Sequence, residues 1–204
     1  MTSIEIKGEP RLLDKAPSRR ESVMLFARNF FKHPKMLGSL IPSSRFLIDE
    51  LLAQVNWKRA RVLVEYGPGV GSFTTEILRR MHPDAKLVVI EMNDEFVRLL
   101  KSSYDDPRLH VVHGSASEVG NILAELGLDH ADYVISGIPF STMPSGVRDS
   151  ILRQTHSALG NNGMFLVYQF SGDVLPHLKS LFREVKQDFE LLNILPARLF
   201  FCFR

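Results

Sequence analysis

The stretch Val64-Glu65-Tyr66-Gly67-Pro68-Gly69-Val70-Gly71-Ser72-Phe73-Thr74 decides the fold, because an apolar run ends there in a glycine-rich turn. Glycine lets the backbone turn sharply and approach a ligand closely, and a helix that follows such a turn offers free N–H groups at its start. We therefore expect a nucleotide-like ligand at Gly67, Gly69 and Gly71. The dinucleotide fingerprint G-x-G-x-x-G would place its third glycine at position 72, which is Ser72, so the spacing argues against NAD.

Short apolar runs rich in β-branched residues recur around this turn, with helix-like stretches between them. The runs cover residues 60–66, 86–91, 109–113, 131–136 and 163–170. Such alternation predicts βαβ units and a mainly parallel sheet whose strands are buried on both faces. A helix over 173–185 and strands over 189–195 and 198–203 follow, and the short link between these strands permits only an antiparallel hairpin. The predicted fold is α/β, with a Rossmann-like seven-stranded sheet that is mostly parallel and ends in this hairpin.

Length and composition fit one domain, because 204 residues, 45% of them hydrophobic, can bury one substantial core. Residues 1–17 are expected to be a flexible lead-in, since glycine and prolines interrupt any apolar period. Residues 18–56 are expected to form an amphipathic helix and a cap, because apolar residues such as Phe26 and Phe30 recur at helical spacing ahead of Pro34. Residues 57–204 are expected to form the ligand-binding core.

Charge is uneven along the chain. The first 45 residues hold nine Lys or Arg against four Asp or Glu, a net +5, while the whole chain carries +2. A basic arm on an acidic body favours an anionic partner such as a lipid surface or nucleic acid, and a solvated tail is the alternative. No stretch of the sequence reaches the roughly 20 apolar residues that span a bilayer, so any membrane contact is expected to be peripheral.

The cysteine and histidine content indicates a reducing cytoplasm and no bound metal. Cys202 is the single cysteine, and the sequence shows no Cys/His cluster with the spacing of a zinc site. His110 and His113 come closest to a ligand pair, but they flank two valines within an expected strand.

The pattern E-x-G-x-G-x-G that begins at Glu65 resembles motif I of class I methyltransferases, which use S-adenosylmethionine (SAM). The resemblance implies that the glycine turn wraps the methionine and ribose part of SAM and that Glu65 helps to orient it. Glu91, at the end of the run 86–91, takes the place of the acid that binds the ribose hydroxyls in that family. A carboxylate can accept hydrogen bonds from both hydroxyls of a diol. Met92 follows and is expected in the same cofactor site.

The run 109–113 ends in His113-Gly114-Ser115-Ala116, where relatives commonly have Gly-Asp-Ala and the Asp accepts a bond from the adenine amino group. The resemblance therefore implies that Ser115 and Ala116 lie at the adenine, although a serine hydroxyl accepts more weakly than a carboxylate. A helix N-cap ahead of Glu118 is the alternative role for Ser115.

The run 131–136 leads into Ser136-Gly137-Ile138-Pro139-Phe140, where methyltransferases that act on amino groups carry a motif of the kind Asn/Asp-Pro-Pro-Tyr/Phe. Methyl transfer is an in-line displacement, so the site has to align the amine and accept its hydrogen bonds. The Ser136 hydroxyl and the carbonyls of Gly137 and Ile138 are candidates for that catalytic role. Phe140 is a candidate for attracting the developing ammonium by a cation–π contact, with a core aromatic as the alternative.

Further segments resemble bacterial phospholipid N-methyltransferases, which convert phosphatidylethanolamine stepwise to phosphatidylcholine and are distant relatives of the rRNA adenine dimethyltransferases. GSLIPSSR over 38–45 is similar to that family's G-x-x-x-P-T/S-S-R, and SGIPF over 136–140 to its Ser-Gly-Leu-Pro. YQF over 168–170 and NILPAR over 193–198 are similar to its Gln-Phe-Thr-Tyr and Asn-Leu-Pro-Pro-Ala-Arg. Ser171 and Gly172 depart from the expected Thr-Tyr, which affects substrate contacts more than the fold.

This second resemblance implies substrate or membrane contacts from residues on both sides of the glycine turn. The residues concerned are Phe30, Phe31, Ser39, Pro42, Ser43, Tyr168 and Arg198. The N-terminal helix favours a lipid on physical grounds as well, because its phenylalanines can enter the membrane interface while each Arg or Lys near anionic headgroups contributes about 1 kcal/mol. The alternative is that this helix packs on the sheet as a lid over the cofactor.

The expected activity is methylation of the amine of a phospholipid, phosphatidylethanolamine and its methylated intermediates, by a cytoplasmic protein that associates peripherally with an anionic membrane surface. An RNA adenine N6-methyltransferase is the main alternative. Ser136 in place of Asn, and a chain that stops where such enzymes usually continue into a helical RNA-binding domain, make nucleic acid the less favoured partner. A non-catalytic SAM-fold binding protein is a third interpretation, and a NAD-dependent oxidoreductase is the weakest.

Overall fold

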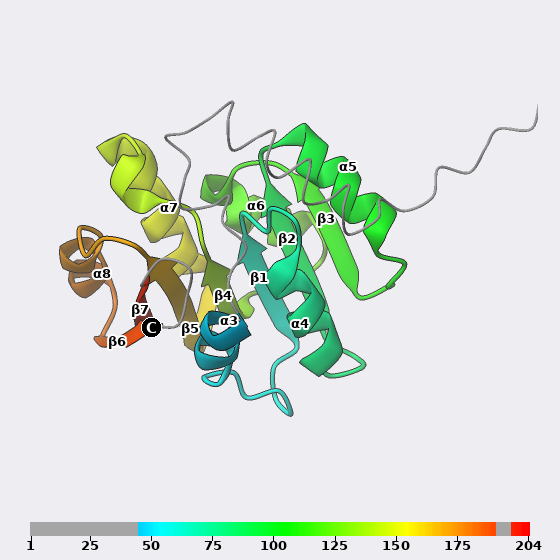
Figure 1. The fold of residues 1–204 in the computed structure, drawn as a ribbon, viewed down its shortest axis with the longest axis horizontal. Helices are drawn as coiled ribbons and strands as arrows, with labels where there is room; N and C mark the ends of the chain where they lie inside the picture. The colour runs from blue at the N-terminus through cyan, green and yellow to red at the C-terminus, as the bar shows by residue number, and fades with distance from the viewer. Residues whose placement is uncertain (1–44, 191–196) are drawn as a thin grey trace, which may run out of the picture.

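The computed structural model describes residues 45–190 and 197–204, and it is built around one seven-stranded sheet (Figure 1). The strand order is β3-β2-β1-β4-β5-β7-β6. Neighbouring strands from β3 to β5 run parallel, whereas β7 is antiparallel to both β5 and β6. The predicted α/β sheet with an antiparallel C-terminal pair is therefore confirmed. The strands are β1 (Val62–Tyr66), β2 (Lys86–Glu91), β3 (Leu109–His113), β4 (Ala131–Ser136), β5 (Leu159–Gln169), β6 (Glu184–Glu190) and β7 (Ala197–Phe203).

Helices cover both faces of the sheet (Figure 1). One face packs against α3 (Arg45–Leu52), α4 (Ser72–Arg80) and α5 (Asp94–Ser103), through residues such as Leu47, Ile77 and Leu100. The opposite face packs against α6 (Val119–Glu125), α7 (Ser145–Ala158) and α8 (Leu175–Leu181). Two short 3₁₀ turns, η2 (Ala116–Glu118) and η3 (Phe140–Thr142), follow β3 and β4. None of the described helices is long and apolar enough to cross a membrane.

Strand β1 shows why the central strands are continuously apolar in sequence. Leu63 points into the core under α3 and α4, and Val64 points into the core under α6 and α7; both are fully buried. Because successive side chains of a strand face opposite sides, a strand covered on both faces needs apolar residues at every position. The exception is Glu65, a buried carboxyl near the end of the strand, which is discussed with the site.

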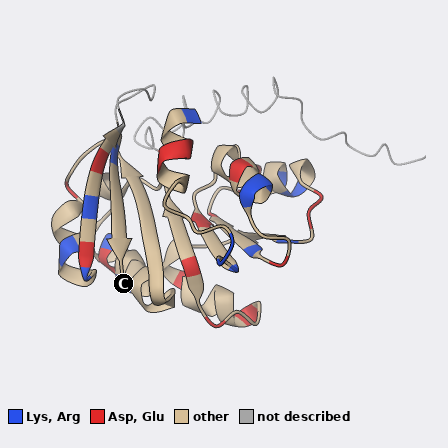
Figure 2. Ribbon diagram, turned by 90° about the horizontal axis from the view of Figure 1, so that it is seen from below, with Lys and Arg blue, Asp and Glu red and all other residues tan. Residues whose placement is uncertain are grey.

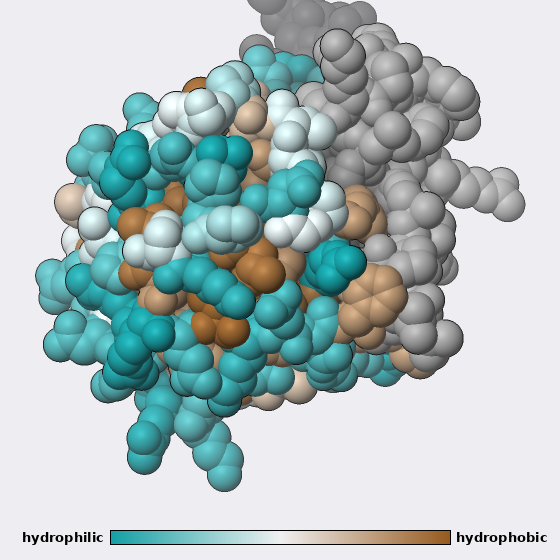
Figure 3. Space-filling model, turned by 90° about the vertical axis from the view of Figure 1, so that its left-hand side faces the viewer, coloured by the Kyte–Doolittle hydropathy of each residue, from teal (hydrophilic) through white to brown (hydrophobic). Residues whose placement is uncertain are grey.

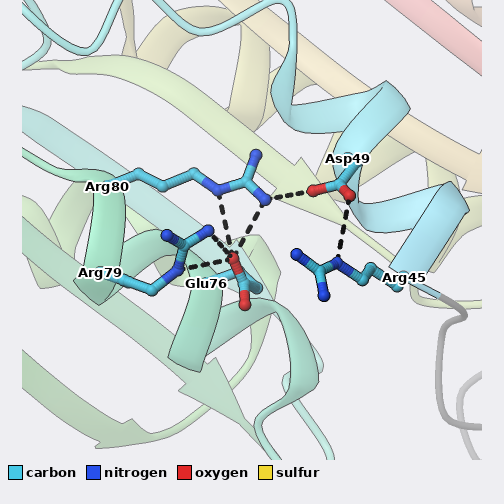
Figure 4. A network of polar contacts seen from close by, with 5 residues as sticks. All are labelled: Arg45, Asp49, Glu76, Arg79 and Arg80. Carbon is cyan, nitrogen blue, oxygen red and sulfur yellow. Dashed lines mark hydrogen bonds and ion pairs between the residues drawn. The ribbon is translucent and has the colours of Figure 1, made fainter.

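An ion-pair network joins α3 to α4 (Figure 4). Arg80 bonds to Asp49 of α3 and, at 3.0 Å, to Glu76 within its own helix, while Arg79 reaches the same Glu76 oxygen at 2.7 Å. The Arg80 hydrogen bond holds the pKa of Asp49 below its ordinary value. The network fixes α3 on α4, the helix that begins at the glycine turn.

The C-terminal boundaries differ from the predicted ones. The predicted helix 173–185 is shorter, because α8 ends at Leu181, and β6 begins at Glu184 and not at residue 189. The sequence of β6, EVKQDFE, places acidic and basic residues along the edge of the sheet (Figure 2), so its strand pattern lacks the apolar character of the inner strands. The flank of the molecule that carries β6 and α8 is predominantly hydrophilic (Figure 3).

Smaller shifts occur elsewhere. β5 begins at Leu159, four residues before the predicted strand, and the first strand begins at Val62, two residues after the start of the predicted run. Within the cap expected up to residue 56, the helix α3 ends at Leu52. The predicted lead-in 1–17, the helix expected from residue 18 to Pro34 and the segment 191–195 lie outside the described residues.

Candidate active site

The glycine turn between β1 and α4 adopts a backbone that other residues rarely adopt. Gly67, Gly69 and Gly71 have φ values of 63°, 55° and 85°. This left-handed region is accessible to glycine at little cost. A Cβ on Gly67 would also lie 2.7 Å from Cγ2 of Ile138. The backbone therefore requires glycine at three alternate positions, and close packing requires it at Gly67 and Gly71 as well.

Tyr104, which follows α5, holds the turn from the other side. Its hydroxyl donates a hydrogen bond to the carbonyl of Gly71 at 3.0 Å and lies 2.7 Å from Oγ1 of Thr75. A Cβ on Gly71 would lie 2.4 Å from the same hydroxyl. Sequence reasoning missed Tyr104, because 33 residues separate it from Gly71 and no motif marks it.

A cavity of about 300 Å³ opens beside the turn, at the carboxyl ends of the central strands. The order of the sheet reverses between β1 and β4, and ligands of open α/β sheets bind at such a switch point. The predicted site residues that line the cavity are Gly67, Gly69, Glu91, Met92, Ser115, Ala116 and Ile138. Residues that the sequence did not single out also line the cavity, among them Asn93, Phe96, Pro139, Thr142, Met143, Val147 and Ile151.

Glu91 presents a buried carboxylate to this cavity. It accepts hydrogen bonds from the backbone N–H of Gly69 at 3.3 Å and of Asn93 at 2.8 Å. Burial raises the pKa of Glu91, and the backbone donors oppose that shift by stabilising the charged form. The carboxylate is thus tied to the glycine turn and keeps lone pairs for a further donor, which matches the role predicted for it towards a ribose diol.

Glu65 lies elsewhere, and the direct cofactor contact predicted for it is not supported. Its side chain is 3% exposed, does not line the cavity and accepts a hydrogen bond from Oγ1 of Thr74 at 2.7 Å. The reason is strand alternation: Tyr66 faces the cavity side of the sheet, so the preceding residue faces α4. In this structure Glu65 is hydrogen-bonded to Thr74 in the first turn of α4, on the side of the glycine turn away from the cavity.

The buried carboxyl of Glu65 makes stability depend on pH. Burial raises its pKa from 4.5 to about 8, so between these values the folded protein holds a proton that the unfolded chain releases. The free energy of unfolding therefore falls as pH rises through this window and changes no further above it. Because the neutral amide of a Glu65→Gln variant does not titrate, its stability relative to the wild type should rise by about 1 kcal/mol per pH unit between pH 5 and 8. Urea denaturation across this range measures the difference, and a difference that stays constant would contradict the assignment.

Ser115 has the N-cap role that was considered as its alternative. Its hydroxyl accepts from the N–H of Ser117 at 3.3 Å, and Glu118 reaches back to the Ser115 N–H at 3.4 Å, which completes a capping box at η2. The residue also lines the cavity next to Ala116. The cap fixes the turn after β3, so the backbone there forms part of the cavity wall.

Some residues of the segment 136–140 line the cavity, and others are buried in the hydrophobic core. Ile138 and Pro139 line the cavity, but Ser136 is fully buried and its Oγ has no hydrogen-bond partner among the described residues. The Phe140 ring is also fully buried and lies edge-on to Phe165, with centroids 6.3 Å apart. The predicted cation–π role of Phe140 is therefore not supported, because that contact needs an open ring face; the alternative role of a core aromatic is confirmed. The Ser136 hydroxyl, likewise, does not face the cavity.

Two predicted substrate contacts, Tyr168 and Arg198, lie away from the cavity wall. The Tyr168 ring is stacked on Phe73 at 5.4 Å and packs against Gly137, where a Cβ would lie 2.1 Å from the Tyr168 hydroxyl. Arg198 is exposed on β7 and lies over the Phe189 ring at 5.6 Å. The remaining contacts predicted from the lipid resemblance lie outside the described residues: Phe30, Phe31, Ser39, Pro42 and Ser43.

The residues present fit a SAM molecule. Gly67 and Gly69 of the glycine turn line the cavity, and a carboxylate held by backbone N–H groups faces the cavity between that turn and the Ser115 cap. Among the residues that the structure describes, no group of three or more His, Cys, Asp or Glu could hold a metal ion.

Comparison with known proteins shows which family the chain is related to. The model of the family described as ribosomal RNA adenine dimethylase matches residues 30–137. The ornithine lipid N-methyltransferase of Singulisphaera acidiphila is 33% identical over 180 residues, which cover 87% of this chain and 94% of that protein. The ribosomal RNA small subunit methyltransferase A of Mycoplasma mycoides is 28% identical over 88 residues, or 43% of this chain and 32% of that protein.

A solved structure supports the fold. The precorrin-6y C5,15-methyltransferase from Geobacter metallireducens superposes with a TM-score of 0.61 at 15% identity, covering 78% of this chain and 87% of that one. The chain therefore belongs to the ribosomal RNA adenine dimethylase family and is a SAM-dependent methyltransferase.

Proposed function

We propose that this enzyme methylates the amine of phosphatidylethanolamine and of its methylated intermediates, towards phosphatidylcholine. The observation that carries the proposal is the extent of likeness to a lipid N-methyltransferase, because that match spans 94% of the relative, whereas the matches to two rRNA small subunit methyltransferases A span 32% and 46% of those proteins. Residues that select the acceptor lie in part outside the shared cofactor core. Likeness over the whole length therefore favours a lipid amine over an RNA adenine.

The proposed contribution of the site to catalysis is to align the amine with the methyl group of SAM. Bound SAM supplies an electrophilic methyl group on a sulfonium. Glu91 would hold the ribose hydroxyls, and Met92 with the turn at Ser115 would enclose the adenine. Ile138 and Pro139 form an apolar wall beside the glycine turn, which keeps water from the place where an amine would meet the methyl group. Orienting the two reactants in this way is a large part of the catalysis available to a methyl transfer.

The test is an assay of the purified protein with methyl-labelled SAM and three acceptors: anionic vesicles with phosphatidylethanolamine, the same vesicles with ornithine lipid, and ribosomal RNA. Label in lipid extracted from the first vesicles is expected. Ornithine lipid is the second candidate acceptor, because the relative matched over 94% of its length is named an ornithine lipid N-methyltransferase. A strong preference for ornithine lipid in this assay would replace phosphatidylethanolamine as the proposed substrate. Label confined to RNA would overturn the lipid proposal.

We also propose that the enzyme is cytoplasmic and docks reversibly on anionic membranes through its basic N-terminal segment, for which the sequence predicts an amphipathic helix ending near Pro34. Replacing both Phe30 and Phe31 with Ser should weaken co-sedimentation with anionic vesicles about tenfold, because the helix loses most of its aromatic area for the interface. The matched control is Phe189→Ser, which removes a phenylalanine that is 48% exposed on β6. Sedimentation of the double variant equal to that of the control would remove the docking role.

A further inference from the structure

Gln169, the last residue of β5, has a buried carboxamide whose donors and acceptor are all engaged. The side chain is 4% exposed. Its Oε1 accepts a hydrogen bond from the N–H of Phe140 at 3.1 Å, and its Nε2 donates to the carbonyls of Ile138 at 2.8 Å and Tyr168 at 2.7 Å. Asn and Gln are the side chains that offer both an acceptor and two donors on one planar group, and Gln has the longer reach.

The two backbone groups that Gln169 binds on the loop flank Pro139. β4 ends at Ser136, so the chain from Gly137 onwards has left the sheet and its backbone groups need other partners. A neighbouring strand would offer one N–H and one C=O to the groups on either side of a residue. The carboxamide of Gln169 offers the same pair, and it thereby extends the sheet by one pairing to a segment that contains a proline.

The loop held in this way is the wall of the cofactor cavity. Ile138 and Pro139 line the cavity, and Cγ2 of Ile138 lies 2.7 Å from the position of a Gly67 Cβ. A shift of this loop by even a few tenths of an ångström would therefore change its contact with the glycine turn. The same loop carries the carbonyls of Gly137 and Ile138, which are the sequence-predicted acceptors for the amine. Each carbonyl oxygen has two lone pairs, so the Ile138 carbonyl keeps one when Gln169 uses the other.

We propose that Gln169 is a positioning residue for methyl transfer: it sets the 137–140 loop so that the amine acceptors stand in line with the methyl donor. Gln169 itself does not line the cavity, so it affects the reaction only through the position of the loop. The inference rests on the proposed N-methylation for the nature of the acceptor, and on the hydrogen bonds above for the position of the loop.

The test compares Gln169→Met and Gln169→Glu with the wild type, and uses whichever acceptor the wild type labels most among the two vesicle types and rRNA. Methionine keeps the length and removes all three hydrogen bonds. We expect kcat to fall about tenfold through misalignment, with the Kd for SAM within about twofold of the wild type. The matched control is Gln154→Met, the same exchange at an exposed position of α7, which should leave kcat unchanged.

Gln169→Glu gives a readout that a purely structural role would not produce. The carboxylate can accept from Phe140 but cannot donate to Ile138, whereas the protonated acid regains one donor. The ratio of variant to wild-type kcat is therefore expected to rise as the pH is lowered from 9 to 6. A ratio independent of pH, a Gln169→Met enzyme with wild-type kcat, or a loss of activity matched by an equal loss of SAM binding would each overturn the proposal. The ratio of kcat values is measured with whichever acceptor the wild type methylates. If the wild type rejects phosphatidylethanolamine, that result counts against the proposed substrate, and the role of Gln169 can still be tested with the other acceptor.

Discussion

Glu91→Gln is expected to weaken SAM binding about 100-fold, as measured by titration calorimetry. The buried carboxylate already accepts the N–H groups of Gly69 and Asn93, and its remaining lone pairs face the cavity. The amide of glutamine has an NH₂ group in place of one carboxylate oxygen. This NH₂ donor would face either a backbone N–H or the ribose hydroxyl that the carboxylate accepts from, so one hydrogen bond is lost. Hydrogen bonds to charged groups contribute about 1.5–3 kcal/mol each, so the loss of one such bond and a mispaired donor gives a change of this size.

Asp94→Asn is the matched control for this prediction. It makes the same exchange of carboxylate for amide three residues further along, where the Asp94 side chain is 67% exposed and lies 3.3 Å from Nδ1 of His113. Exposed pairs of this kind contribute little, so its Kd should stay within about twofold of the wild type. If the two variants bind SAM equally well, the cavity beside Glu91 is not the ribose site.

The sheet could be predicted from the sequence because its signals are local. Each inner strand is a short apolar run, and the glycine turn follows directly after the first of them. The edge strand β6 lacked that signal. Glu184, Lys186 and Asp188 alternate with less polar residues on an exposed edge, and the predicted helix was extended across the first part of the strand. Burial on one side alone gives a weaker pattern than burial on both.

The cofactor site could be predicted only where one motif follows one strand. Glu91 is the last residue of its strand, and Gly67 and Ser115 follow closely after theirs; parallel strands bring their carboxyl ends to the same edge. Val147 and Ile151 could not be found in this way, because they reach the cavity from α7 and their place depends on how that helix crosses the sheet. Glu65 and Phe140 show the converse error. Each occupies a motif position, but strand alternation and a 3₁₀ turn direct the two side chains into the core.

Position along a motif and direction of a side chain are thus separate pieces of information. The motif fixes where the backbone passes, and the sheet decides which side chains face the ligand. In this enzyme the backbone itself does much of the shaping, through three glycines with positive φ and a loop held by Gln169. Substitutions that disturb the backbone of the turn should therefore be at least as damaging as the loss of a side chain that contacts the ligand.

Gly67→Ala puts this to the test, and we expect kcat to fall about 100-fold and SAM binding to weaken in parallel. Alanine at a φ of 63° costs about 1–2 kcal/mol of strain. Its Cβ would also lie 2.7 Å from Cγ2 of Ile138, so the cavity wall has to move, and a displacement of about 1 Å near reacting atoms can cost 100-fold in rate.

Gly127→Ala separates these two causes. Gly127 has a similar φ of 69°, but a Cβ there would meet nothing within 4 Å, so this variant carries the strain without the collision. It should lose stability and keep the wild-type kcat and Kd for SAM. Adding Ile138→Ala to Gly67→Ala removes the colliding Cγ2 and should restore part of the SAM binding. Equal kinetic losses in Gly67→Ala and Gly127→Ala would show that strain alone is responsible, and would remove the contact between the glycine turn and the 137–140 loop as the basis of alignment.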